Sequence, residues 1–147
     1  QDDVDLYGLE AELVYQLTPS IKTTVFGDYI RAELSDGGNL PRIPPMRVGG
    51  QLNYQGEQFA AEVSVSHYFE QDDIAEYETN TDSYTMLDAN FNYYLSGMSD
   101  SDWASDTIIF VKGQNLTDEE ARVHSSFLKE DAPLPGRSIS LGIRGSF

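Results

Sequence analysis

The segment from residue 134 to residue 147 alternates in polarity with a period of two residues. One set of its side chains is apolar apart from a glycine in register, and comprises Ile139, Leu141, Ile143, Gly145 and Phe147. The intervening set is polar, and comprises Ser138, Ser140, Arg144 and Ser146. Because successive side chains of a β-strand point to opposite faces, this pattern predicts a strand with one apolar and one polar face.

The same alternation recurs in six earlier segments. They predict strands at residues 4–17, 21–34, 46–54, 59–69, 83–95 and 107–115, ahead of the last strand from residue 137. Phe26 interrupts the pattern of the second strand, and residues 30–33 slip out of phase. We interpret the slip as a β-bulge near the rim of the sheet. The phase of the sixth strand is ambiguous because it begins with consecutive apolar residues.

The lengths of the connections carry further information. They are short at residues 18–20 and 55–57, intermediate at 96–106, and long at 35–45, 70–82 and 116–136. In an up-and-down sheet all three long loops fall at one end. Outer-membrane barrels show this asymmetry, whereas a soluble sandwich or a lipocalin-like barrel does not require it. The sequence therefore predicts an all-β protein, an antiparallel up-and-down transmembrane β-barrel.

Composition excludes several other classes of protein. No apolar run approaches the roughly 18 residues of a membrane-spanning helix. The net charge of −16, from 25 acidic and 9 basic residues, argues against a nucleic-acid partner. The chain has no cysteine and therefore no disulfide, thiolate metal site or cysteine nucleophile. We find no catalytic triad, phosphate-binding loop or paired catalytic carboxylates, so we do not expect an enzyme.

Three stretches of the chain resemble the last third of TonB-dependent receptors. They are residues 39–49 (NLPRIPPMRVG), residues 83–94 (SYTMLDANFNYY), and residues 111–119 (VKGQNLTDE) with Pro135, Gly136, Arg137 and Phe147. The resemblance implies an outer-membrane barrel of a Gram-negative bacterium, 22-stranded and closed by an N-terminal plug. It also implies contact with outer-membrane lipid, energy supplied by TonB, and Phe147 as the signal read by the barrel-assembly machinery.

The cargo is suggested by one further stretch. Residues 124–137 (HSSFLKEDAPLPGR) are similar to the ends of receptors in the zinc- and haem-uptake branch. The resemblance therefore favours uptake of zinc or haem, with a ferric siderophore as the alternative cargo. No resident cofactor is expected.

The predicted number of strands indicates a portion of a larger barrel. A complete single-chain bacterial barrel has an even number of strands, with both ends in the periplasm. Seven strands would also leave two open edges whose N–H and C=O groups hydrocarbon cannot satisfy. We therefore expect residues 1–147 to be the C-terminal portion of the barrel domain, without the plug through which TonB acts and without the earlier strands.

Candidate ligand-binding residues lie in the predicted extracellular loops. A neutral imidazole at His124 could ligate zinc or haem iron, although a single histidine without a partner at i+2 or i+4 is more often an ordinary loop residue. Asp72, Asp73 and Glu76, together with Glu78, supply enough carboxylates for a hard cation, with a solvated acidic loop as the alternative. A hard-cation site and a solvated acidic loop are also the alternatives for a second acidic set, Asp100, Asp102 and Asp106.

The faces of the strands are expected to differ in environment. Aromatic residues at strand ends are expected to form two interfacial girdles, namely Tyr15, Tyr29, Tyr54, Phe69, Tyr84 and Tyr93. His67 is expected beside one of them. On the inward face, Arg47, Asp88 and Arg144 are expected to pair with one another or with the plug. The rival folds are a soluble β-domain acting as a binding module, whose core would join Leu87, Phe91, Leu141 and Ile143, and a passive pore built from several copies.

Overall fold

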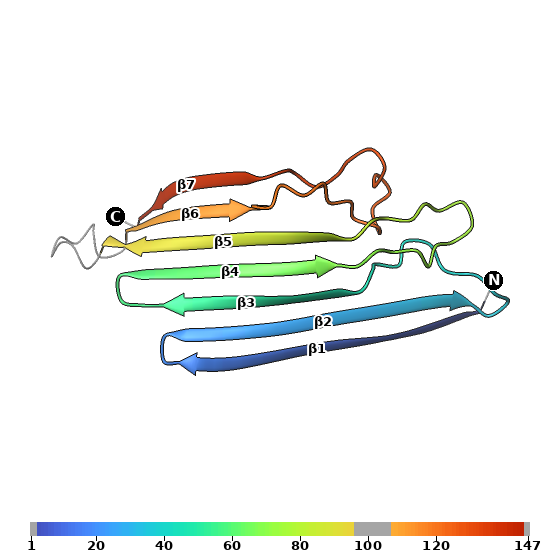
Figure 1. The fold of residues 1–147 in the computed structure, drawn as a ribbon, viewed down its shortest axis with the longest axis horizontal. Helices are drawn as coiled ribbons and strands as arrows, with labels where there is room; N and C mark the ends of the chain where they lie inside the picture. Colours follow the sequence, from blue (N-terminus) through green and yellow to red (C-terminus); the bar gives the residue numbers. More distant parts are fainter. Residues whose placement is uncertain (1–2, 96–106, 146–147) are drawn as a thin grey trace.

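The computed structural model describes residues 3–95 and 107–145. These residues form the strands β1 (Val4–Thr18), β2 (Ile21–Leu34), β3 (Arg47–Gln55), β4 (Phe59–Tyr68), β5 (Tyr84–Tyr94), β6 (Ile108–Gln114) and β7 (Ser138–Arg144). All neighbouring pairs are antiparallel, and the strands lie in sequence order in a single sheet (Figure 1). The predicted all-β, up-and-down architecture is confirmed. Among the described residues, no helix is long and apolar enough to cross a membrane.

The connections are sorted by length between the two ends of the sheet. The loops at 35–46, 69–83 and 115–137 lie at the end near the N-terminus, and the turns at 19–20 and 56–58 lie at the opposite end (Figure 1). The predicted asymmetry is therefore present. It places the long loops close enough together to pack against one another.

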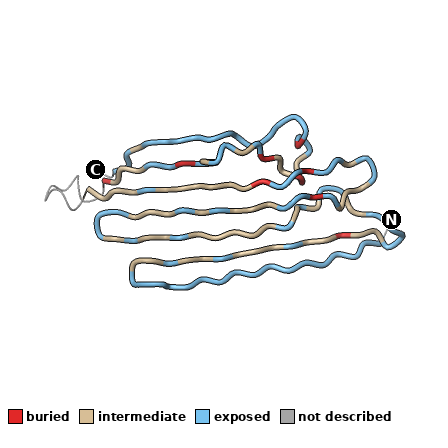
Figure 2. The backbone as a smooth tube through the Cα atoms, viewed as in Figure 1, coloured by how far each residue is buried: buried red, intermediate tan, exposed pale blue. Residues whose placement is uncertain are grey.

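The register gathers the apolar positions of every strand onto one face. Val63 lies between Leu52 and Ala89, for example, and Val111 lies between Phe91 and Leu141. These side chains are largely exposed, Leu141 to 75%. In the described part of the chain the only buried apolar residues are Ala32, Tyr84 and Ala121, and Figure 2 shows little buried backbone along the strands. The closed core that a soluble β-domain requires is therefore not formed.

Aromatic side chains border the apolar face at both ends. Tyr54 stacks on Phe59 with 4.8 Å between ring centroids, and His67 meets Phe69 edge-on at 4.7 Å. The separation from Phe59 to Phe69 along the chain corresponds to roughly 33 Å of strand. At a strand tilt of about 40° this is close to the ~25 Å height of the apolar band of an outer-membrane barrel. The band and its aromatic borders thus have membrane dimensions.

The prediction of a β-bulge at residues 30–33 is wrong. The β1–β2 pairing is continuous from Val4–Leu34 onward, and its register shift lies beside the turn, between Gln16 and Thr18. The apparent slip in the sequence has another cause. Arg31 and Glu33 lie on the apolar face beyond the aromatic border, where the Arg31 guanidinium is 2.5 Å from the Glu33 carboxylate. Ion pairing at the strand end replaces the expected bulge.

The interruption at Phe26 is explained by its cross-strand neighbour. Phe26 points to the polar face, where its register partner is Gly49 and its ring occupies the space of a side chain at that glycine. Phe110 covers Gly142 in the same way. This second pair settles the phase of β6, because it places Phe110 on the polar face and Val111 on the apolar face. An aromatic ring that covers a glycine in a neighbouring strand is a known device for fixing register.

A methyl group at position 49 should therefore be costly. The Cβ of a Gly49→Ala variant would overlap the Phe26 ring and lie 2.7 Å from the carbonyl oxygen of Val65, which belongs to the backbone. We expect a loss of about 1–3 kcal/mol in the free energy of unfolding. The matched control is Gly50→Ala, whose Cβ meets nothing closer than the Thr24 carbonyl oxygen at 3.5 Å. Thermal unfolding midpoints compare the two, and equal midpoints would contradict the packing argument.

Candidate functional site

A row of four polar and aromatic residues crosses the polar face at its long-loop end. Asp28, Arg47, Tyr68 and Tyr84 are successive register partners on β2, β3, β4 and β5. The Arg47 guanidinium lies 2.7 Å from the Asp28 carboxylate. The Tyr68 and Tyr84 rings stack with 4.6 Å between centroids. The row thus presents an arginine that is already paired with an aspartate, beside two stacked phenols.

A cavity of about 230 Å³ lies over this row. Pro44 and Pro45 from the first long loop and residues 123–125 from the last long loop complete its lining. Arginine binds carboxylate and phenolate groups through directed N–H donors, and tyrosine rings stack on flat organic groups. The lining is therefore suited to an anionic organic ligand.

His124, the first of the sequence-based candidates, borders this cavity and is buried. Its Nδ1 lies 3.0 Å from the Thr81 hydroxyl and 3.5 Å from the Lys129 ammonium. Because an ammonium only donates, we assign Nδ1 as the acceptor and place the proton on Nε2. Nε2 lies 3.1 Å from a Glu78 carboxylate oxygen, outside hydrogen-bonding alignment.

The ionisation of His124 and Glu78 follows from these contacts. Burial and the Lys129 ammonium lower the pKa of the His124 imidazole, against the opposing effect of Glu78. Burial raises the pKa of the Glu78 carboxyl, but the N–H donors of Ala75 and Arg42 and the electrostatic effects of the His124 ring and the Lys129 ammonium outweigh it, so that this pKa is lowered. At neutral pH the cluster therefore contains a carboxylate, a neutral imidazole and an ammonium.

Of the acidic candidates, Glu78 lies beside His124, whereas Asp72, Asp73 and Glu76 do not. Asp73 lies 2.6 Å from the Arg31 guanidinium, and Asp72 borders a separate small cavity with Asp73 and Arg31. Glu76 lies on an exposed surface with Tyr77 and Phe127. No group of three or more His, Cys, Asp or Glu suited to a metal ion occurs among the residues that the structure describes. Asp100, Asp102, Asp106 and Phe147 lie outside the described residues.

Two expected placements are corrected by the register. Tyr84 is expected in an interfacial girdle, but it lies on the polar face opposite Tyr68 and is only 8% exposed. Arg47 pairs with Asp28 rather than with Asp88 or Arg144, and Asp88 instead accepts a hydrogen bond from the backbone N–H of Asn115 at 2.8 Å. The alternation along β5 could have assigned Tyr84 to the polar face, because it is separated by even numbers of residues from Asp88, Asn90 and Asn92.

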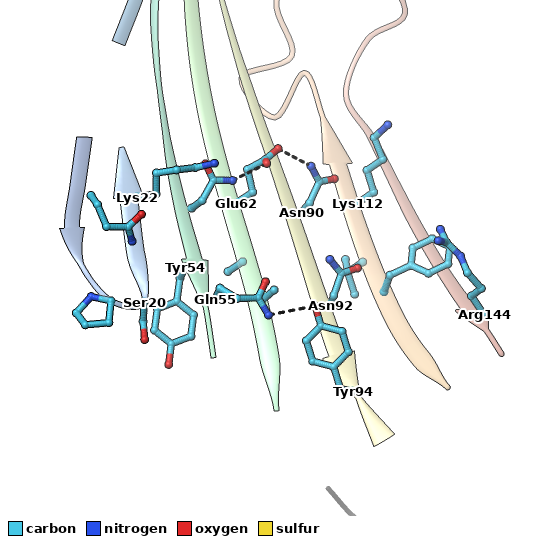
Figure 3. A pocket seen from close by; sticks show the side chains of 17 residues that line it. Ser20, Lys22, Tyr54, Gln55, Glu62, Asn90, Asn92, Tyr94, Lys112 and Arg144 are labelled. Carbon is cyan, nitrogen blue, oxygen red and sulfur yellow. Dashed lines mark hydrogen bonds between the residues drawn. The ribbon is translucent and has the colours of Figure 1, made fainter. Parts of the chain in front are cut away.

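A second cavity, of about 640 Å³, lies on the polar face near the short turns. At its wall the Glu62 carboxylate accepts hydrogen bonds from the side-chain amides of Gln51 and Asn53 on β3 and of Asn90 on β5. Figure 3 shows the bond between Asn90 and Glu62. Its charged lining is otherwise cationic, from Lys22, Lys112 and Arg144. The wall is therefore locally positive in a chain whose net charge is −16.

The chain was compared with known families and structures. A family profile described as TonB dependent receptor-like, beta-barrel matches residues 1–116. The copper transporter OprC is 22% identical with a TM-score of 0.82, and the match covers 99% of this chain and 24% of the OprC chain. The chain in the FpvAI–pyocin S2 complex is 14% identical with a TM-score of 0.76, and the match covers 99% of this chain and 20% of that one. The ferric yersiniabactin uptake receptor FyuA from Yersinia pestis is 18% identical with a TM-score of 0.68, and the match covers 97% of this chain and 23% of the receptor.

At these identities the solved structures establish a shared fold. This chain spans between 20% and 24% of the length of the three solved chains. In each case the match extends over nearly all of the present residues, so the whole sheet and its loops have counterparts in those structures.

Proposed function

Since its residues 1–116 match the family's barrel profile, this chain belongs to the TonB-dependent receptor family, and we propose that it forms the C-terminal part of a receptor barrel. It is an outer-membrane β-barrel protein of a Gram-negative bacterium. The open order of the described strands supports further strands in the complete receptor, because β1 and β7 each have an edge without a partner. Hydrocarbon cannot satisfy such edges.

The complete receptor is proposed to take up a scarce metal as an organic complex. The observation that carries this proposal is the cavity lined by Arg47, Tyr68 and Tyr84 beneath the long loops. Of the two cargoes favoured by the sequence, haem suits this lining better than free zinc, because its carboxylates can compete with Asp28 for the Arg47 guanidinium and its flat ring can stack on tyrosine. A ferric siderophore with phenolate or carboxylate groups fits for the same reason. A cavity of about 230 Å³ receives only part of such a ligand. His124, Asp72, Asp73 and Glu76 remain predictions as direct ligands.

The partners follow from the family and from the polar face. TonB-dependent receptors interact with TonB, and we propose that it acts here through a plug held in the lumen. The cationic wall of Lys22, Lys112 and Arg144 suits an acidic segment of such a plug. Contact with outer-membrane lipid, through the apolar face, and recognition by the barrel-assembly machinery complete the proposed partners.

The cargo proposal is tested by changing Arg47 in the complete receptor. We expect Arg47→Met to weaken binding of an anionic complex by about 10-fold or more, because a hydrogen bond to a charged group contributes about 1.5–3 kcal/mol. Haemin, a ferric catecholate and Zn²⁺ are the probes, and isothermal titration gives the dissociation constants.

Two controls accompany this variant. Arg137→Met removes an arginine that is half exposed and 3.8 Å from Asp118, away from the cavity lining, and should leave binding unchanged. The double variant Asp28→Asn, Arg47→Met removes both charges of the ion pair, so that no unpaired carboxylate is left to destabilise the fold. A loss of binding in this variant is therefore due to the missing arginine and not to misfolding. Binding of Zn²⁺ without binding of either organic complex would overturn the cargo proposal.

A further inference from the structure

The three long loops meet at a single carboxylate, that of Glu78. Its Oε1 accepts a hydrogen bond from the backbone N–H of Arg42, in the first long loop, at 2.9 Å. Its Oε2 accepts one from Ala75, in its own loop, at 3.1 Å. The same Oε1 lies 3.1 Å from His124 Nε2 and 3.7 Å from Lys129 Nζ, both in the last long loop. One side chain thus contacts all three loops.

The cluster is buried although it is built from ionisable groups. The side chains of Glu78, His124 and Lys129 are 8%, 1% and 10% exposed. A buried charge is tolerated when it is paired and hydrogen-bonded, and removing one partner leaves the other uncompensated. The Glu78 carboxylate and the Lys129 ammonium therefore depend on each other, and the loops that carry them are energetically coupled.

Other contacts between the loops surround this carboxylate. The Lys129 ammonium donates to the backbone carbonyl of Thr79 at 2.5 Å, and the Thr79 hydroxyl donates to the Glu130 carboxylate. The Arg42 guanidinium lies 3.4 Å from the centroid of the Phe127 ring, a cation–π contact between the first and last long loops. Each pair of the three loops is therefore joined by at least one direct contact.

We propose that Arg42, Glu78, His124 and Lys129 form a loop clasp, which makes the three long loops open and close as one cooperative unit. Residues 123–125 and Pro44 and Pro45, which lie beside the clasp in sequence, line the cavity over Arg47. Opening the clasp uncovers that cavity from two sides at once. This consequence for ligand entry rests on the proposed function, whereas the coupling of the loops does not.

Hydrogen exchange of the complete receptor, without ligand, tests the coupling. Glu78→Gln keeps the shape of the side chain and removes its charge. We expect amide exchange to rise by about 10-fold or more in all three segments 36–45, 71–82 and 117–134, because loss of a charged hydrogen-bond acceptor lowers the opening free energy of the whole unit. Peptides from β3, β4 and β5 should keep their protection, which shows that the barrel is folded.

Glu70→Gln is the matched control, since Glu70 is an exposed glutamate in the same loop and has no role in the proposed site. It should leave the segments 36–45 and 117–134 unchanged. Lys129→Met should reproduce the effect of Glu78→Gln, and the double variant should add little to either single variant. Faster exchange confined to residues 71–82, or no change in any loop, would overturn the clasp.

A second measurement connects the clasp to binding. If it gates the cavity, the association rate of haemin or of the ferric catecholate should rise in Glu78→Gln and not in Glu70→Gln, as measured by stopped flow. Coupled exchange without any change in association rate would retain the clasp and reject the cavity as the binding site. The two proposals can therefore fail separately.

Discussion

Replacing Val63 with arginine is expected to destabilise the membrane-inserted barrel by about 2–4 kcal/mol. Val63 lies on the apolar face, between the aromatic residues Phe59 and Phe69 at the two ends of its strand, and it is exposed there. An arginine at this depth of a lipid-facing surface costs about 2–4 kcal/mol. Its register neighbours, Leu52 and Ala89, offer no partner for the charge.

The neighbouring residue provides the control. Ser64 faces the polar side between Gln51 and Asp88, so an arginine introduced by Ser64→Arg can remain hydrated or pair with a carboxylate. Urea titration of each variant folded into phospholipid vesicles gives the free-energy differences. Equal losses for the two variants would show that the apolar face of this sheet does not contact lipid.

Replacing Asn115 is expected to release the base of the last long loop. Its side chain is 1% exposed, donates to the carbonyls of Glu119 and Pro135 at 2.9 and 3.1 Å, and accepts from the Glu119 N–H at 2.9 Å. Asn115→Ala removes all three hydrogen bonds and leaves the backbone groups of Glu119 and Pro135 without these partners, at a cost of about 1–3 kcal/mol. It also forces alanine into a left-handed backbone, since φ is 49° at this position.

The two contributions can be separated with glycine. Asn115→Gly removes the same hydrogen bonds but tolerates the backbone angle, so it should be about 1 kcal/mol less harmful than Asn115→Ala. Limited trypsin cleavage at Arg122 and Lys129 in the complete receptor reports release of the loop. If both variants resist cleavage as the unaltered protein does, the loop is held by other contacts.

These contacts also give a physical reason for the Asn-Leu-x-Asp stretch by which the sequence resembles the family. Asn115 and Asp118 both have a positive φ, and Asp118 accepts the backbone N–H of Arg137 at 2.8 Å. The stretch therefore joins the end of β6 to the approach to β7.

The sequence alone determined the strands, the faces of most of them and the sorting of the loops. These properties are local, because the period of two is a consequence of strand geometry and needs no knowledge of distant residues. Along β2, the pattern was broken by contacts that the period of two does not encode. Phe26 is polar-facing because Gly49 leaves room for its ring, and the second strand needs no bulge because Arg31 meets Glu33 and Asp73.

Only the tertiary structure decided which residues form the site. Arg47, Tyr68 and Tyr84 come together through the register of three strands, and His124 meets Glu78 across 46 positions of sequence. No periodicity encodes such contacts, since loop side chains follow no repeating direction and their burial depends on what the other loops supply. The sequence identified His124 as an accessible candidate ligand, whereas packing of the three loops made it a buried partner of a carboxylate and an ammonium.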